Sequence, residues 1–144
     1  MLIAALVTLL LLHFGLHGES AVSDVQVAVE TMREFAKDEI HEAERLERIL
    51  ATLDEMSHSQ EEFLTAVTSA HIQILMVESQ YDAGAEAYRS ACKHLEEVWE
   101  AAERRMIDLR FRLKDDLTRA EWNAMFEKLS KSLGIELVTT PTSG

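Results

Sequence analysis

Histidines and carboxylates are the side chains of this sequence that could carry metal chemistry. Asp38-x-x-His41 and Glu55-x-x-His58 each place a carboxylate and an imidazole three residues apart, on one face of a helix. Di-iron helical bundles use two Glu-x-x-His pairs and two further glutamates. Here one pair has Asp, the other falls at an expected turn, and residues 60–116 contain no such pair. We expect surface histidines, no bound metal and no cofactor; a weak site at the Glu55 turn or across a dimer is the alternative.

No pattern typical of a catalytic centre accompanies these pairs. The sequence contains no Gly-rich phosphate loop, nucleophile elbow or P-loop. The single Cys92 cannot form an intrachain disulfide, and it lies on an apolar seam. A buried thiol or an intermolecular disulfide across a dimer would explain it. We predict that the protein is not an enzyme.

Composition and charge indicate an acidic, all-α protein. The 144 residues include one Pro and five Gly, and the net charge is −12, which argues against nucleic acid as a partner. The charge is uneven, because residues 104–144 hold eight basic and six acidic side chains. This basic end would either rest on anionic lipid head groups or form i,i+4 ion pairs on a solvated helix face.

The N-terminal segment differs from the rest of the chain, because residues 1–18 contain no charged side chain. The apolar run Leu2–Leu12 has the length of a signal-peptide core, and extension to Gly18 gives about 27 Å of helix, close to a thin bilayer core. Residues 1–20 are therefore predicted to be a lipid-embedded anchor or a signal peptide cleaved before Ala21, with a buried core helix as a third alternative. We expect a bacterial inner-membrane protein facing the periplasm, or a periplasmic one if cleaved.

Three capping boxes predict where helices begin. They are Ser23-x-x-Gln26, Ser59-x-x-Glu62 and Thr118-x-x-Glu121, each with a hydroxyl at the N-cap and an acceptor three residues later. They predict helices over residues 24–56, 60–116 and 119–133, the last ending at Gly134. Together these form a helical domain over 21–135, followed by a disordered tail at 136–144.

Apolar residues recur at alternating steps of three and four, as in a coiled coil. The seam is interrupted by Glu39, which Ile40 could replace, and by a stutter at Tyr81–Ala85 that contains Gly84. We predict an extended antiparallel hairpin of the first two helices about Ser57–Ser59, with the third helix folding back. Two helices bury little core, so a homodimer or a protein partner is expected.

A candidate contact surface combines aromatic and basic residues from the C-terminal half of the chain. Its members are Trp99, Phe111, Trp122 and Phe126, with Arg104, Arg105 and Arg112 around them. Aromatic and arginine side chains are enriched where proteins bind one another. This surface predicts that the protein acts as a scaffold, an accessory subunit or a sensor domain.

The segment Leu117-Thr118-Arg119-Ala120-Glu121 resembles the Leu-Thr-x-x-Gln motif of Spy-type periplasmic chaperones and related heavy-metal resistance sensors. It departs from that motif because Glu121 replaces the Gln, the motif occurs once, and no His/Met ligand cluster matches the sensors. The resemblance implies an all-helical, often dimeric envelope protein. It adds a Spy-like chaperone or metal-responsive sensor as the alternative function.

Overall fold

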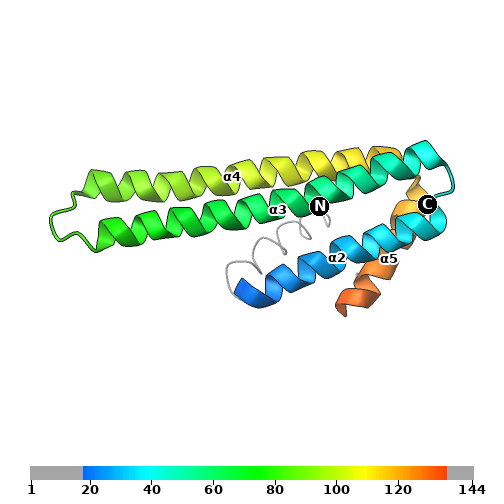
Figure 1. The fold of residues 1–144 in the computed structure, drawn as a ribbon, viewed down its shortest axis with the longest axis horizontal. Coiled ribbons are helices and arrows are strands. Elements are labelled where there is room, and N and C mark those ends of the chain that lie inside the picture. The colour runs from blue at the N-terminus through cyan, green and yellow to red at the C-terminus, as the bar shows by residue number, and fades with distance from the viewer. Residues whose placement is uncertain (1–17, 136–144) are drawn as a thin grey trace, which may run out of the picture. The chain divides into compact units, whose positions relative to one another are not determined.

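The computed structural model describes residues 18–135, with side chains from residue 24 onward. This part of the chain is all-helical and contains no strand. Its four helices are α2 (Gly18–Glu39), α3 (Ala43–Glu78), α4 (Ala85–Asp116) and α5 (Arg119–Leu133), shown in Figure 1. Nearly all of the predicted anchor or signal peptide, and all of the predicted tail, lie outside the described residues. None of the described helices is both long and apolar enough to cross a membrane.

The predicted helix over residues 24–56 is wrong, because the chain turns at residues 40–42. Helix α2 is already helical at Ser23, which therefore does not cap it, and it ends at Glu39. The Ile40 amide donates to the Ala36 carbonyl, and the Ile40 side chain is buried. The Glu39 interruption of the apolar seam, for which we expected Ile40 to substitute within one continuous helix, instead marks the end of a helix.

The predicted turn at Ser57–Ser59 is also wrong, because these residues lie inside α3. Serine and histidine are tolerated in helix interiors, and the apolar seam continues through Met56 and Phe63, so nothing interrupts the helix there. The Ser59 hydroxyl is buried and accepts a hydrogen bond from Arg105 Nε at 2.9 Å instead of capping a helix.

The second turn lies at residues 79–84, within the predicted helix 60–116. The Ala83 amide donates to the Gln80 carbonyl, and the Gly84 carbonyl accepts from the amides of Ala87 and Tyr88 at the start of α4. The heptad stutter at Tyr81–Ala85 is therefore a break between two helices. Continuous periodicity on both sides of a short loop looks, in sequence, like one helix with a local irregularity.

The prediction for α5 is confirmed at both ends. The Thr118 hydroxyl accepts from the Glu121 amide at 3.2 Å, and the Glu121 carboxylate accepts from the Thr118 amide at 2.8 Å. At the other end Gly134 adopts a left-handed conformation with φ 64°. Its amide donates to Lys131, and the Ile135 amide donates to Ser130 at 2.9 Å, which is the Schellman pattern.

The chain divides into two units, and the boundaries fall within α3 and α4. Unit 1 comprises residues 1–54 and 111–144, and unit 2 comprises residues 55–110. In unit 1, α2 packs against α5 (Figure 1). Its buried apolar side chains include Val29, Phe35, Ile49, Leu53, Met125 and Leu129.

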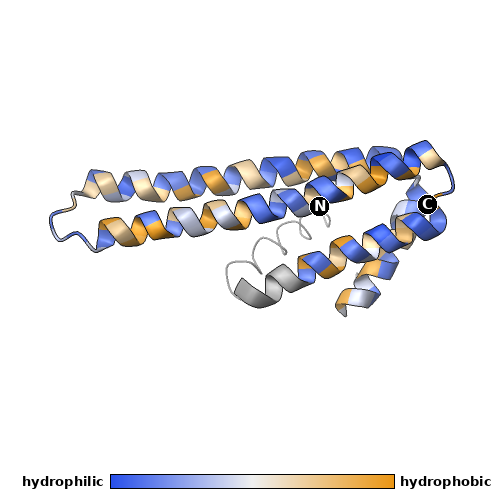
Figure 2. Ribbon diagram, in the orientation of Figure 1, coloured by the Kyte–Doolittle hydropathy of each residue, from blue (hydrophilic) through white to orange (hydrophobic). Residues whose placement is uncertain are grey.

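Unit 2 consists of two antiparallel helical segments joined by the loop at 79–84. Phe63 of α3 packs edge-on against Trp99 of α4, with ring centroids 4.7 Å apart, and the Tyr88 hydroxyl contacts Glu78 next to the loop. Apolar residues recur along both segments up to the loop (Figure 2). Two helices leave one side of each segment open, so much of this apolar surface stays exposed.

Candidate protein-binding surface

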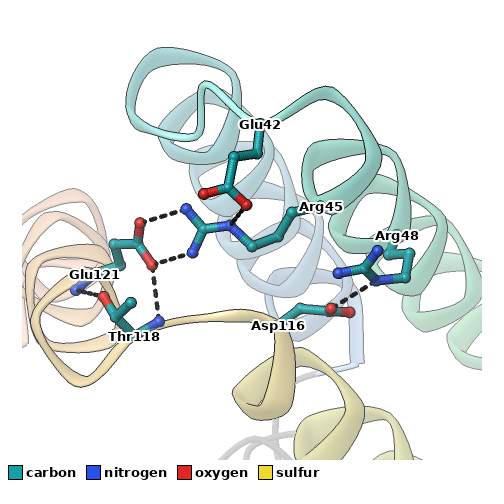
Figure 3. A network of polar contacts seen from close by, with 6 residues as sticks. All are labelled: Glu42, Arg45, Arg48, Asp116, Thr118 and Glu121. Atoms are coloured by element: carbon teal, nitrogen blue, oxygen red, sulfur yellow. Dashed lines mark hydrogen bonds and ion pairs between the residues drawn. The ribbon is translucent and has the colours of Figure 1, made fainter.

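A polar network in unit 1 occupies the residues of the Spy-like motif (Figure 3). Arg45 donates to both Glu121 carboxylate oxygens, at 2.8 and 3.0 Å, while Glu121 also accepts from the Thr118 amide. Burial raises the pKa of Glu121, but the hydrogen bonds from Arg45 and Thr118 outweigh it and lower that pKa below its usual value. Glu121 therefore remains ionised and engaged in a helix cap, as a structural residue.

A second ion pair lies beside the first one. Arg48 Nε donates to the Asp116 carboxylate at 2.8 Å, which joins the start of α3 to the end of α4 within unit 1 (Figure 3). Leu117, the first residue of the motif, is buried. The geometry of this segment is accounted for by helix capping and ion pairing.

The histidine pairs considered for metal binding do not form a cluster. Among the described residues no group of three or more His, Cys, Asp or Glu side chains could hold a metal ion. His58 Nε2 lies 3.2 Å from Glu62, one turn further along α3, and Glu55 lies 3.8 Å from Arg105. Since residues 57–59 are helical, the turn that would have gathered Glu55 and His58 does not exist.

In unit 2, the predicted contact residues mainly join α3 to α4. Trp99 is half-buried against Phe63. Arg105 bonds to Ser59 and lies near Glu55, and exposed Arg104 pairs with Glu100, one turn earlier, at 3.5 Å. The contacts of Trp99 and Arg105 stabilise the pairing of the two segments, whereas the Arg104 pair lies within α4.

The remaining predicted contact residues belong to unit 1. Trp122 and Phe126 are half-buried and pair with each other, with ring centroids 4.7 Å apart. Phe111 is exposed, with Lys114 Nζ 5.6 Å from its ring centroid, and Arg112 is exposed as well. The seven predicted residues are therefore divided between the two units. Trp122 pairs with Phe126 in unit 1, whereas Trp99 pairs with Phe63 in unit 2.

The apolar surface that sequence reasoning missed lies on α3 near the loop. Ile72, Leu75 and Met76 are 52%, 61% and 58% exposed. The segment around them, residues 63–77, contains no Asp, Glu, Lys or Arg. Ile72, Leu75 and Met76 are spaced three and four residues apart, so they share one face of the helix. We call Ile72, Leu75 and Met76 the neutral face; the uncharged run was the signal that could have revealed it.

Beside the neutral face, a groove of about 780 Å³ runs between α3 and α4 within unit 2. Met76 belongs both to the neutral face and to this groove. The α4 side combines small side chains with larger polar ones. The residues that line the groove are Gln73, Met76, Val77 and Gln80 from α3 and the loop, and Ala87, Ser90, Ala91, Lys93, His94 and Glu97 from α4.

Acidic residues outnumber basic ones in the segment that contains the groove, whereas the lining itself holds one of each, Glu97 and Lys93. Residues 63–103 contain seven acidic side chains and two basic ones, Arg89 and Lys93. Arg89 pairs with Glu86 at 2.7 Å, and Lys93 lies 3.8 Å from Glu97. Both basic side chains are thus already next to a carboxylate, and the excess negative charge remains.

Comparisons with family models, with curated proteins and with solved structures gave no match. The Spy-type resemblance of residues 117–121 therefore stays a prediction.

Proposed function

We propose that this protein acts by binding another protein through the neutral face of α3, as a scaffold, accessory subunit or sensor domain without enzymatic activity. The observation that supports this most is the exposure of Ile72, Leu75 and Met76 within an uncharged stretch. Burying what remains exposed of each such side chain contributes about 1 kcal/mol. A partner, whether another protein or a second copy in a coiled-coil-like assembly, would gain that free energy.

The uncharged residues 1–18 support the proposal that this binding takes place at a membrane. We propose an anchor in the bacterial inner membrane with the helical part facing the periplasm, or release to the periplasm after cleavage before Ala21. Intact mass and alkali extraction from native envelopes test this. Full-length, alkali-resistant protein would support the anchor, and a soluble form lacking residues 1–20 would support cleavage.

The neutral face is tested with the double variant Ile72→Ser/Leu75→Ser. Its matched control is Ile107→Ser, which changes an apolar residue that is 39% exposed on α4. We expect crosslinking of native envelopes, followed by mass spectrometry, to lose a partner of the wild type in the double variant and to retain it in the control. Helical circular dichroism should be unchanged in both. Retention of every crosslinked partner in the double variant would refute a role for this face.

A Spy-like chaperone or metal-responsive sensor is the second candidate. An exposed apolar face on an acidic helical pair is a feature that would favour transient binding of unfolded clients. This candidate predicts slower aggregation of a reduced client protein, or a metal-dependent rise in melting temperature. If neither occurs, the candidate is abandoned in favour of a defined partner.

A further inference from the structure

We infer that the neutral face of α3 binds a second copy of this chain, so that two α3 helices pack antiparallel about a twofold axis at Ile72. This inference rests on the proposed protein-binding function and names the partner at that same surface.

The neutral face continues along α3 as a stripe within unit 2. Its positions recur at steps of three and four residues, which places them on one side of the helix. All of them are exposed, with short hydroxyl side chains at one end and large apolar ones at the other. The stripe consists of Thr65, Thr68, Ser69, Ile72, Leu75 and Met76.

The charge of the chain restricts where two copies can meet. Each copy carries a net charge of −12, and a twofold contact brings the same surface of both copies together, so excess charge on that surface would be doubled. Residues 63–77 contain no Asp, Glu, Lys or Arg, whereas no other such run within residues 18–135 exceeds five residues. This run is therefore the part of the described chain where two copies can touch without opposing like charges. A partner recognised by its charge would find no ion-pairing group there.

The sizes of the side chains support an antiparallel arrangement. With Ile72 on the twofold axis, Leu75 of one copy lies opposite Ser69 of the other, and Met76 lies opposite Thr68. Each large side chain then meets a small one, and this alternation lets two helix surfaces interdigitate. A parallel pair would instead oppose large to large and small to small, and it would leave gaps at the hydroxyl end.

The length of the uncharged run limits the strength of this contact. Its 15 residues extend for about 22 Å, or about four helical turns. A single crossing of two helices over that length lies at the low end of specific interfaces, so we expect a weak and reversible dimer. Covalent capture is therefore the appropriate way to detect it.

Disulfide formation in native envelopes that carry the full chain tests the geometry. Cys92→Ser first leaves the chain without a thiol. Ile72→Cys then places two thiols across the twofold axis, within reach of a disulfide. Its matched control is Thr65→Cys, an exposed position on the same face that would lie about 20 Å from its counterpart in the other copy.

We expect mild oxidation to yield at least about tenfold more disulfide dimer from Ile72→Cys than from Thr65→Cys. Thr68→Cys chains mixed with Met76→Cys chains should also crosslink, because these positions face each other. Residues 1–18 are the same in every variant, so association through that segment would not produce the difference. Equal crosslinking of the two single variants, or none at residue 72, would overturn the inference.

Opposite charges at residue 72 test whether the partner is a second copy. Two differently tagged copies are expressed together, and one tag is used to purify the other. Ile72→Glu in both copies, or Ile72→Lys in both, should reduce co-purification by about fivefold or more, because like charges meet at the axis. Ile72→Glu in one copy and Ile72→Lys in the other should restore it. Ile107→Glu, at an exposed apolar residue of α4, is the control and should leave it unchanged. Loss without recovery in the mixed pair would overturn the inference.

The serine variant separates this inference from the proposed function. If Ile72→Ser/Leu75→Ser loses only the second copy from its crosslinks in envelopes, both are supported. If it loses a different protein, and wild-type copies do not co-purify, the neutral face binds that protein and only the inference fails. If it retains every crosslinked partner, including the second copy, both fail.

Discussion

Glu121 joins a local interaction to a distant one. Its contact with Thr118 spans three residues and closes the start of α5, whereas its contact with Arg45 spans 76 residues and ties α5 to α3 within unit 1. Both side chains of this ion pair are about one-fifth exposed, so water screens the pair less than it would at a fully open surface. Protonation of this one carboxylate should therefore change the stability of the folded protein.

We expect Glu121→Gln to reduce the loss of protein stability that occurs when the pH is lowered. The pKa of Glu121 in the folded protein lies below its usual value, because the hydrogen bonds from Arg45 and Thr118 outweigh the effect of burial. Its contribution is complete above the ordinary pKa of a glutamate, about 4.3, and is lost as the pH falls from there through the lowered pKa of the folded protein. Urea unfolding at pH 7 and pH 3 should show a smaller loss for Glu121→Gln than for the wild type.

The control for this experiment is Glu127→Gln. The pKa of Glu127 is also lowered, and the hydrogen bond from Lys131 is the largest cause. Unlike Glu121, however, Glu127 is exposed on the surface of α5. We expect Glu127→Gln to change the pH dependence of stability less than Glu121→Gln does, because exposed ion pairs contribute little to the free energy of unfolding. An equal effect of the two substitutions would show that the Arg45 contact is unimportant.

At the residue scale, sequence reasoning identified the local half of this site. Thr118 and Glu121 follow a capping rule that operates over four residues, so their hydrogen bonds were predictable. The contribution of Arg45 was not, because no local rule relates residues 76 positions apart. The same limit explains why Ser59 was expected to cap a helix and instead bonds Arg105.

At the element scale, Gly84 and Gly134 lie at helix ends but have different conformational requirements. Gly134 has a positive φ, whereas Gly84 does not, and a Cβ atom at either position would meet nothing within 4 Å. Any cost of a side chain at Gly134 therefore comes from backbone strain and not from a clash. Gly84 instead precedes α4, where its carbonyl begins the helical hydrogen-bond pattern.

Gly134→Ala should destabilise the protein by about 1 kcal/mol, because alanine resists the left-handed conformation. Gly84→Ser should be neutral or stabilise it by a few tenths, about 0.3 kcal/mol, because serine is a better N-cap. Thermal unfolding of the two variants beside the wild type measures both changes. The opposite order of stability would mean that these helix ends are assigned incorrectly.

Ser57→Pro tests the corrected position of the turn. Because Ser57 lies inside α3, proline should remove an interior hydrogen bond and cost about 3 kcal/mol or more. Ser57→Ala, which keeps the helix, should leave stability almost unchanged. Tolerance of proline, measured by helical circular dichroism and urea unfolding, would favour the turn at Ser57–Ser59 that the sequence first indicated.

These elements also show which helix signals can be trusted. The start and end of α5 were predictable because a capping box and a left-handed glycine occurred together at the correct separation. Ser23 and Ser59 satisfied the same pattern but lie within continuing helices, which have no end at these positions. The breaks near Glu39 and Gly84 appeared in sequence as faults in the heptad, a signal that does not distinguish an irregular helix from a turn.

At the scale of the whole molecule, net negative charge opposes folding. The chain carries a net charge of −12, and several ion pairs among the described residues join exposed side chains. Exposed pairs contribute about 0–1 kcal/mol each. Repulsion among the excess carboxylates should therefore outweigh the attraction that salt would screen.

We expect the melting temperature to rise by several degrees, about 3–5 °C, between 20 and 300 mM NaCl. Circular dichroism measures the change, and KCl at the same concentrations is the control for an effect of ionic strength. A fall in melting temperature with salt would show that the ion pairs, and not the repulsion, dominate.

The candidate surface was the part of the molecule that sequence reasoning predicted least well. Aromatic and arginine residues near the C-terminal end were predicted to contact a partner, whereas in the structure Trp99 and Arg105 make contacts inside unit 2. The neutral face was missed because sequence reasoning followed only the predicted apolar seam, to which Ile72 and Leu75 do not belong. Exposure depends on which faces of a helix have neighbours, and helix periodicity alone does not supply that.

The two tryptophans of the chain are distributed one to each unit. Trp99 packs on Phe63 in unit 2, and Trp122 packs on Phe126 in unit 1. Each unit thus has its own intrinsic fluorophore, and a pair of single-tryptophan proteins would report the unfolding of one unit at a time. Whether their emission changes coincide would reveal if α3 and α4, which pass through both units, transmit unfolding from one to the other.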